Sequence, residues 1–195
     1  MIVRISPLLY WYARVLVVGG VALGAVVLVV DPRWLDLLLP TLGLTVLVVV
    51  LRVGPVRLSK YSYLTQSGIP TLVGALTLTP SCVVAALGAG IVVADVVWVR
   101  KPWIAAWINA GRDTIAFVAA YGFYSFVLRV TGVTELSLDF LPAAFTLIGV
   151  YFLATRALFY FTLLVRDKLE SAEQILILRW EIISYLLTVI GTVNR

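Results

Sequence analysis

The feature that most restricts the fold of this chain is a succession of long apolar runs separated by short polar or basic turns. Apolar residues make up 62% of the 195 residues and charged residues 13%, against about 45–50% and about 25% in soluble domains. A soluble domain of this size has too much surface for its volume to hide so many apolar side chains. The lipid bilayer is therefore expected to be the main solvent of the chain.

The lengths of the apolar runs predict membrane-spanning helices. A helix that crosses the hydrocarbon core needs about 20 mostly apolar residues. By that measure the sequence predicts one all-α integral membrane domain over residues 1–195, a polytopic transmembrane helix bundle of about seven spans, within a range of six to eight. No soluble domain or linker is evident. The expected spans are 8–30, 34–52, 61–79, 80–99, 103–130, 140–165 and 174–193.

Two of these assignments have alternatives. Only Thr79-Pro80-Ser81 separates the third span from the fourth, so one long kinked or re-entrant segment over 61–99 is the rival interpretation. The run from 8 to 30 exceeds the apolar region of a secretory signal, and no small-residue cleavage site precedes Asp31. We therefore interpret this run as a retained first span.

The distribution of Lys and Arg predicts the orientation in the membrane. Loops that hold an excess of these residues face the cytoplasm. Basic residues occupy alternate turns, whereas acidic residues dominate the others. The amino terminus and the basic turns are thus expected in the cytoplasm of a bacterial inner membrane; the basic positions are Arg4, Arg52, Arg57, Lys60, Arg100, Lys101, Arg166 and Lys168.

The composition excludes several kinds of chemistry. The chain has no histidine, and Cys82 is its only cysteine. Histidine-based acid–base catalysis, Cys–His nucleophiles, zinc sites and intramolecular disulfides are therefore ruled out. We expect no catalytic site, no metal and no cofactor, and we interpret Cys82 as a small packing residue. The net charge of +5 is spread over short loops, so no nucleic-acid partner is expected.

Seven polar residues fall inside or close to the predicted spans. Charges at membrane depth cost several kcal/mol on an isolated helix, so they usually face a bundle interior and pair with one another. We therefore expect an inward-facing polar seam. Its candidate residues are Asp95, Asn109, Arg112, Asp113, Arg156, Arg179 and Glu181.

Depth along the helices predicts which of these residues meet. Asp113 lies ten residues beyond Trp103, and Arg156 lies ten residues before Arg166, so both are about 15 Å from the same membrane boundary. We expect an ion pair between Asp113 and Arg156 near the middle of the bilayer. Asn109 shares the face of Asp113, because residues four apart are neighbours on a helix.

Three interpretations of the polar seam remain open. Interhelical hydrogen bonds and ion pairs can fix helix register without any ligand. Alternatively, the seam can line a pocket or polar path for a small ligand or an ion. Asp95 and Arg179, near the boundary, can also belong to the lipid-facing surface. The Gly20–Gly24 spacing is compatible with intramolecular helix packing or with a dimer.

Three stretches resemble the amino-terminal multi-span sensory region of bacterial signalling proteins. The first, "GPVRLSKYSYLTQSGIPTLVGALTLTPSCVVAALGAGIVVADVVWVRKPWIAAWINAGRDTIAF", has a helix-opening Pro80, an acid at Asp95, a basic-aromatic turn and Asn109. The other two are "YFLATRALFYFTLLV" and "SAEQILILRWEIISYLLTVIG". The resemblance covers roughly residues 54 to 193. One departure is that Arg156 stands where the family often has Asn at this position or the one before.

The resemblance implies a function. In that family the membrane region precedes a GGDEF, HD-GYP or histidine kinase output domain in the cytoplasm, after one further span. Seven spans would leave Arg195 on the outer side, so we expect a piece of a longer gene product or a short stand-alone relative.

The leading hypothesis is a membrane-embedded sensory or signal-transmitting module without a catalytic site of its own, of the kind found in cyclic-di-GMP signalling. The alternatives are a small structural subunit of a larger membrane complex and a small-solute transporter. Expected partners are the lipid bilayer, a second copy or a larger complex, and an unknown small ligand.

Overall fold

The computed structural model describes residues 7–54, 56–57, 63–64, 67–133 and 140–165. These residues are helical apart from connecting turns and one antiparallel pair of two-residue strands. The elements are α1 (Pro7–Val30), a 3-10 turn η1 (Pro32–Trp34), α2 (Leu38–Val53), β1 (Val56–Arg57), β2 (Tyr63–Leu64), α3 (Gly68–Thr77), α4 (Pro80–Val93), a π-helical segment η2 (Ala94–Trp98), α5 (Trp103–Thr131) and α6 (Leu141–Val165).

Four helical segments of the described chain are long and apolar enough to cross a membrane. They are α1, α4 continued by η2, α5 and α6. The prediction of an all-helical membrane bundle is thus confirmed at this level. With 16 residues in α2 and 10 in α3, these two helices are about 24 Å and 15 Å long, shorter than the hydrocarbon core of about 30 Å.

The predicted count of about seven spans is therefore not confirmed, and the prediction of a full span over 61–79 is wrong. Residues 63–64 form a strand, and the helix that follows has only ten residues. Leu78 and Thr79 are extended, and Pro80 opens α4, so the predicted break at Pro80 is present. The predicted span 174–193 lies outside the described residues.

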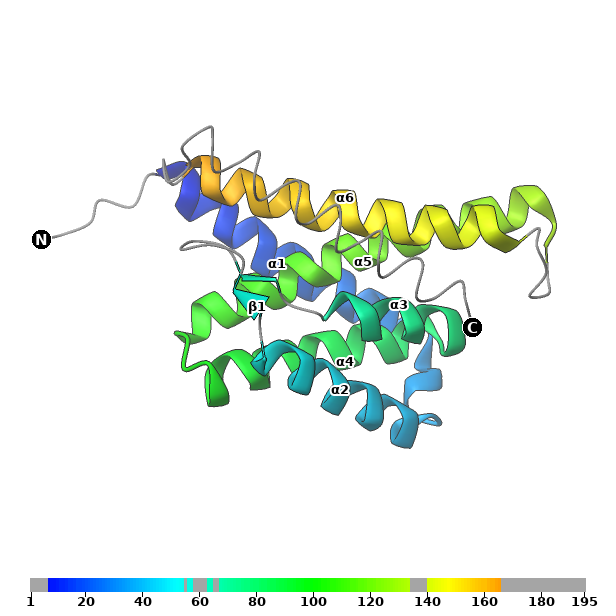
Figure 1. The fold of residues 1–195 in the computed structure, drawn as a ribbon, viewed down its shortest axis with the longest axis horizontal. Helices are drawn as coiled ribbons and strands as arrows, with labels where there is room; N and C mark the ends of the chain where they lie inside the picture. The colour runs from blue at the N-terminus through cyan, green and yellow to red at the C-terminus, as the bar shows by residue number, and fades with distance from the viewer. Residues whose placement is uncertain (1–6, 55, 58–62, 65–66, 134–139, 166–195) are drawn as a thin grey trace, which may run out of the picture.

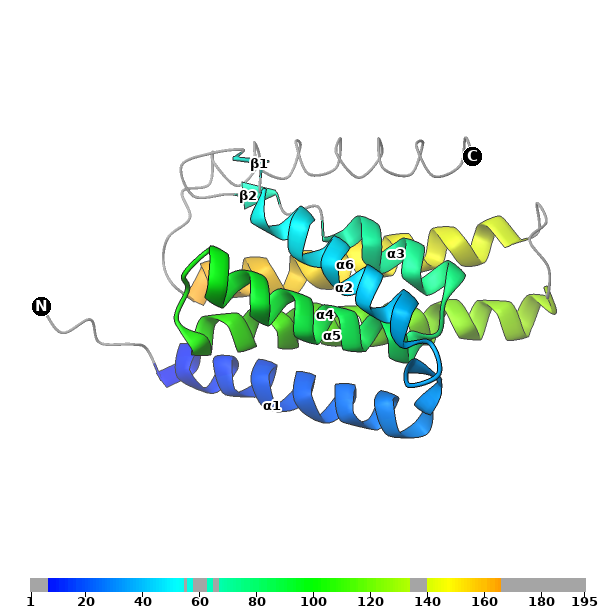
Figure 2. The same cartoon turned by 90° about the horizontal axis from the view of Figure 1, so that it is seen from below.

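The long helices run side by side along the long axis of the molecule (Figures 1 and 2). Helix α4 is central and contacts α1, α2, α3 and α5, while α5 packs between α1 and α6. The hydrophobic core is accordingly centred on α4 and α5. Its fully buried large side chains include Leu87 and Ile91 of α4, Phe117 of α5 and Leu147 of α6.

Glycines allow the helices to approach closely at two crossings. A Cβ on Gly20 of α1 would overlap the Gly111 backbone of α5, and a Cβ on Gly111 would overlap the Leu16 carbonyl. A Cβ on Gly90 of α4 would lie 2.8 Å from Val48 Cγ1 of α2. Gly20 therefore serves packing within the chain, and Gly90 has the same role where α4 crosses α2.

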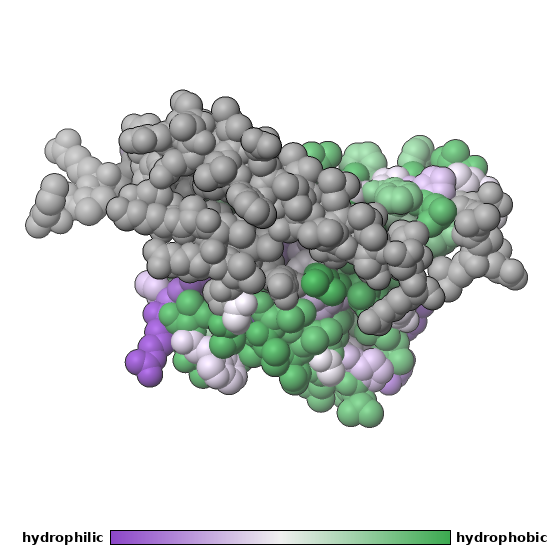
Figure 3. Space-filling view, in the orientation of Figure 1, coloured by the Kyte–Doolittle hydropathy of each residue, from purple (hydrophilic) through white to green (hydrophobic). Residues whose placement is uncertain are grey.

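The outer surface of the bundle is apolar. Large side chains such as Val29 and Leu39 are 79% and 82% exposed, and most of the described surface visible in Figure 3 is hydrophobic. Exposed aliphatic side chains on this scale are unusual on soluble monomers. Such a surface is suited to contact with lipid tails.

Candidate functional site: a buried polar cluster at one end of the bundle

Asp95 is the centre of a group of polar side chains buried among the apolar helices. It is 0% exposed and accepts hydrogen bonds from three residues. Arg52 binds it in bidentate fashion, with Nε 2.9 Å from Oδ1 and Nη2 2.9 Å from Oδ2. Lys101 Nζ lies 3.1 Å from Oδ1, and Asn109 Nδ2 lies 2.6 Å from Oδ2. The carboxylate is thereby saturated with donors from three different segments.

Asp113 extends this group along α5. Its Oδ1 accepts a hydrogen bond of 2.9 Å from Arg112 Nε, and its Oδ2 lies 3.6 Å from Arg52 Nη1. Arg52, which is 3% exposed, therefore bridges both buried carboxylates. We call Arg52, Asp95, Lys101, Asn109, Arg112 and Asp113 the polar cluster.

The local backbone positions Asp95 and Lys101. The last turn before the α4–α5 connection is π-helical, over Ala94–Trp98, and the Asp95 carbonyl accepts a hydrogen bond from the Lys101 amide at 2.8 Å. Arg100 has a positive φ of 56°, a left-handed conformation that is uncommon for a residue with a side chain. The reversal of the chain at Arg100 turns Lys101 back toward the carboxylate.

Helix packing brings Arg52 to the same place. Arg52 lies in the last turn of α2, and the close α2–α4 crossing at Gly90 lies about one turn before Asp95. The cluster therefore lies at the end of the bundle where α2 and α4 finish and α5 begins, on the left in Figure 1. We call this the basic end.

The balance of charges makes the cluster tolerable in an apolar setting. Three cations, Arg52, Lys101 and Arg112, surround two carboxylates, Asp95 and Asp113. Isolated buried charges cost several kcal/mol, whereas a hydrogen-bonded pair offsets much of that cost. Loss of either carboxylate would leave the buried Arg52 guanidinium without one of its two partners.

The predicted pair between Asp113 and Arg156 is wrong. Among the described residues, Asp113 forms its ion pairs with Arg52 and Arg112. The Arg112 guanidinium lies 5.7 Å from the centre of the Phe159 ring of α6. The Arg156 guanidinium lies 5.8 Å from the ring centre of Phe152 on its own helix. Equal depth of Asp113 and Arg156 was therefore insufficient to predict an ion pair, because Arg112 on α5 lies closer to Asp113.

The other sequence candidates have mixed outcomes. Asp95, Asn109, Arg112 and Asp113 are brought together as an inward-facing seam on α4 and α5. Arg179 and Glu181 lie outside the described residues. The sequence-based prediction missed Arg52 and Lys101, because both were assigned to cytoplasmic loops. Comparing depths along the helices could have found Arg52. Like Asp95, Arg52 lies about one helical turn inside the same membrane boundary.

A smaller polar group lies at the opposite end of the bundle. Asp31 accepts hydrogen bonds from Arg33 Nε at 2.6 Å and from Ser81 Oγ at 3.0 Å, which ties the α1–α2 turn to the start of α4. The Arg33 hydrogen bond lowers the pKa of the Asp31 carboxyl, and burial opposes this effect. Because Arg33 is largely exposed, water screens this pair and its contribution to stability is small.

Chemically, the polar cluster is suited to holding helices together, because its side chains come from α2, the α4–α5 connection and α5. No group of three or more metal-ligating side chains occurs within the described residues. Asp95 already accepts four hydrogen bonds. No family model, curated protein or solved structure matches this chain.

Proposed function

We propose that this chain is a membrane-embedded sensory or signal-transmitting module, in which the polar cluster determines how α2 and the end of α4 pack against α5. The observation that carries the proposal is the bidentate Arg52–Asp95 pair, buried among apolar helices and linked through Arg52 to Asp113. Buried ion pairs are weak sources of net stability, but they can specify one packing over another.

The irregular backbone next to Asp95 supports the proposal. A π-helical segment and a left-handed non-glycine residue lie within six residues of each other. Both features are found often at functional or moving sites, because they are retained only where the surrounding structure holds them. Their coincidence with the charged residues favours a helix end that can change its packing.

The hydrogen bonds of Asp95 favour this function over solute transport. A proton carrier has to release its partners at some stage, and four donor contacts from three residues already occupy the Asp95 carboxylate. The stretch from Pro80 to Asn109 that resembles bacterial sensory regions is also the stretch that supplies Asp95, Lys101 and Asn109.

The same reasoning gives the orientation that we propose. The basic end holds Arg52, Arg57, Arg100 and Lys101, whereas at the opposite end of the described chain Asp31 and Asp36 are balanced by Arg33 and Arg129. By the positive-inside rule the basic end faces the cytoplasm of a bacterial inner membrane. A change in helix packing there would be passed to a cytoplasmic partner or domain.

Spin labels at the basic end test this proposal. The labels are placed at Val53 and Ile104, exposed positions next to the cluster on α2 and α5, in a Cys82→Ala background in nanodiscs. Pulsed electron paramagnetic resonance measures the distance between them. We expect two distance populations whose ratio changes by about tenfold in Asp95→Asn, the equivalent of about 1.4 kcal/mol.

The matched control is Arg33→Gln, which removes the exposed ion pair at the opposite end and should leave the distance distribution unchanged. Thermal unfolding confirms that each variant is folded. A single distance that is identical in the unsubstituted chain and in folded Asp95→Asn would contradict the proposal. That outcome would favour the alternative of a rigid structural subunit.

A further inference from the structure

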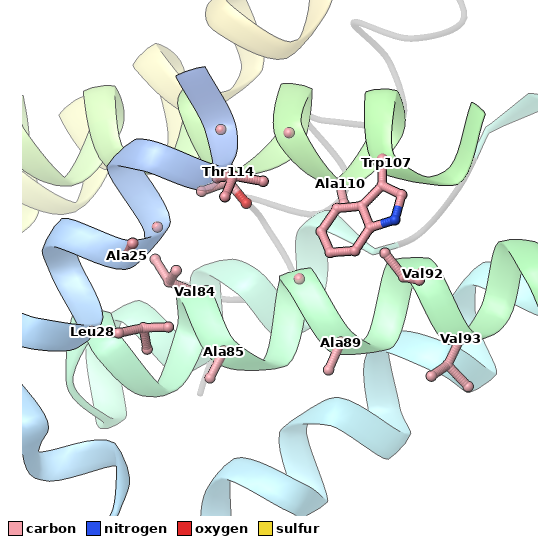
Figure 4. Close-up of a pocket in the computed structure, with 15 residues that line it drawn as sticks. Ala25, Leu28, Val84, Ala85, Ala89, Val92, Val93, Trp107, Ala110 and Thr114 are labelled. Atoms are coloured by element: carbon pink, nitrogen blue, oxygen red, sulfur yellow. The ribbon is translucent and has the colours of Figure 1, made fainter. Parts of the chain in front are cut away.

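A groove lies among α1, α4 and α5 (Figure 4), and none of the residues that line it belongs to the polar cluster. Its volume is about 410 Å³, within the range of about 300–1,000 Å³ typical of small-molecule sites. It extends over 20–28 of α1, 84–93 of α4 and 107–114 of α5. Because these stretches are parts of membrane-spanning helices, the groove lies in the apolar layer.

Missing side chains create the groove. The Gly20–Gly111 contact holds α1 against α5, while Gly88 presents no side chain on the facing side of α4. A Cβ added to Gly88 would have no atom of another helix within 4 Å, so the space beside it is open. Val21 and Val93 line the groove and are 49% and 40% exposed, which opens it toward the lipid.

The hydroxyl of Thr114 is the feature that points to a ligand. Seven other helical threonines donate to the carbonyl four residues earlier: Thr41, Thr45, Thr71, Thr77, Thr131, Thr146 and Thr155. Within the described residues Thr114 makes no such bond, although it is only 4% exposed. Its oxygen is directed into the groove in Figure 4. A hydroxyl without a partner in an otherwise apolar groove is costly unless a bound molecule supplies one.

The lining defines the chemical class of that molecule. Apart from Thr114 and the Trp107 indole, the groove is lined by Gly, Ala, Val and Leu, and no charged side chain lines it. A charged group would be unpaired there and therefore costly. We propose that the groove binds a single-chain membrane lipid that carries one uncharged hydroxyl or carbonyl group, hydrogen-bonded to Thr114.

The position of the groove connects it to the polar cluster. Ala110, Gly111 and Thr114 line the groove on the stretch of α5 that also carries Asp113. On α4, Val93 of the groove directly precedes the π-helical segment that contains Asp95. A lipid in the groove would bias the packing at the basic end. The idea that the bound lipid acts as the signal for this change rests on the proposed function, whereas the binding of the lipid does not.

Photoaffinity labelling tests the binding. The probe is 1-hexadecanol bearing a diazirine, added to the chain in nanodiscs, and mass spectrometry locates the labelled peptides. We expect saturable labelling of the α1, α4 and α5 peptides that line the groove, displaced by 1-hexadecanol but not by hexadecane. Thr114→Val keeps the shape of the side chain and should weaken apparent binding about three- to tenfold, as expected for one hydrogen bond.

A groove-filling variant provides the matched comparison. Gly88→Leu places a side chain into the open space and should abolish saturable labelling, whereas Gly43→Leu should leave it unchanged. Gly43 likewise has room for a Cβ but lies on α2, outside the groove. Thermal unfolding shows that both variants are folded.

Three results would overturn the proposal. Labelling that spreads over all exposed helices and is unaffected by Gly88→Leu would indicate bulk lipid. Displacement by hexadecane as strong as by 1-hexadecanol would show that the hydroxyl group of the lipid does not contribute to binding. An altered oligomer mass in Gly88→Leu with unchanged labelling would assign the groove to a helix of a second copy.

The labelling result and the spin-label result are independent. Saturable labelling without any effect of 1-hexadecanol on the distance between the Val53 and Ile104 labels would retain the lipid site and reject its role as an input. Two distance populations that respond to Asp95→Asn, without saturable labelling, would retain the proposed function and reject the lipid site.

Discussion

At the residue scale, Asp95 and Arg52 are the two side chains whose removal should matter most. Each is almost completely buried, and the two form a bidentate pair. In a partly apolar setting, the loss of one partner leaves an uncompensated charge. The energetic consequence therefore depends more on the remaining partner than on the bond that is lost.

Asp95→Ala should lower the free energy of unfolding by about 3–5 kcal/mol, the range for a broken buried pair. Adding Arg52→Met should restore part of the loss, because the unpaired guanidinium is then gone. Unfolding in mixed micelles measures the stability of Asp95→Ala, of Arg52→Met and of the double variant. Arg33→Gln, at an exposed pair, should change stability little; additive effects of Asp95→Ala and Arg52→Met would contradict the pairing.

Arg100 offers a second test at this scale, because its φ of 56° is left-handed. Such a conformation costs an ordinary L-residue about 1–2 kcal/mol, and glycine avoids most of this cost. Arg100→Gly should therefore raise the melting temperature, whereas Arg100→Ala, which also removes the charge, should not. Equal melting temperatures for the two variants would show that the backbone conformation carries no cost.

At the scale of helices, glycines decide how closely pairs of helices pack. A side chain at Gly20 or Gly111 would meet backbone atoms of the opposing helix, which cannot turn away as a flexible side chain can. Gly122 lies on the same helix as Gly111 and has open space around it. The two positions on α5 thus separate the effect of close packing from that of helix propensity.

Gly111→Ala should destabilise the chain by at least about 1–3 kcal/mol, the usual cost of overpacking, because α1 and α5 must move apart. Gly122→Ala should be neutral or stabilising, since alanine favours a helix over glycine. Thermal unfolding of the two variants in the same detergent provides the comparison. A loss of stability in Gly122→Ala as large as in Gly111→Ala would rule out the close crossing as the cause.

At the scale of the whole molecule, the exposed apolar belt and the two polar ends predict a simple accessibility pattern. Single cysteines in a Cys82→Ala background, treated with a membrane-impermeant thiol reagent, report it. Val18→Cys, 67% exposed in α1, should stay unlabelled because lipid covers it. Val99→Cys at the basic end should react only from the cytoplasmic side, and Leu35→Cys only from the other. Rapid labelling of Val18→Cys would contradict the membrane setting.

The sequence predicted that the chain forms a bundle of long apolar helices, but it did not predict every span or which charged residues pair. Long apolar runs were sufficient to predict α1, α4, α5 and α6, because a lipid setting demands continuous helices. The third predicted span failed, since apolar composition does not reveal that 63–64 pairs as a strand and that the helix starts at Gly68. Asp95, Asn109 and Asp113 were identified by their cost in lipid, but which residues pair depends on helix rotation and crossing, and a single sequence does not record these.

The π-helical segment over Ala94–Trp98 has a consequence for how the chain tolerates deletions. A π turn accommodates one residue more than an α turn, so loss of Val96 or Val97 would leave an ordinary, unbroken helix. The α turn that remains covers about the same rotation as the π turn that it replaces, so Lys101 would still face its carboxylate. A one-codon deletion within regular α4 would instead rotate all residues beyond it by about 100° and carry Asp95 away from Arg52.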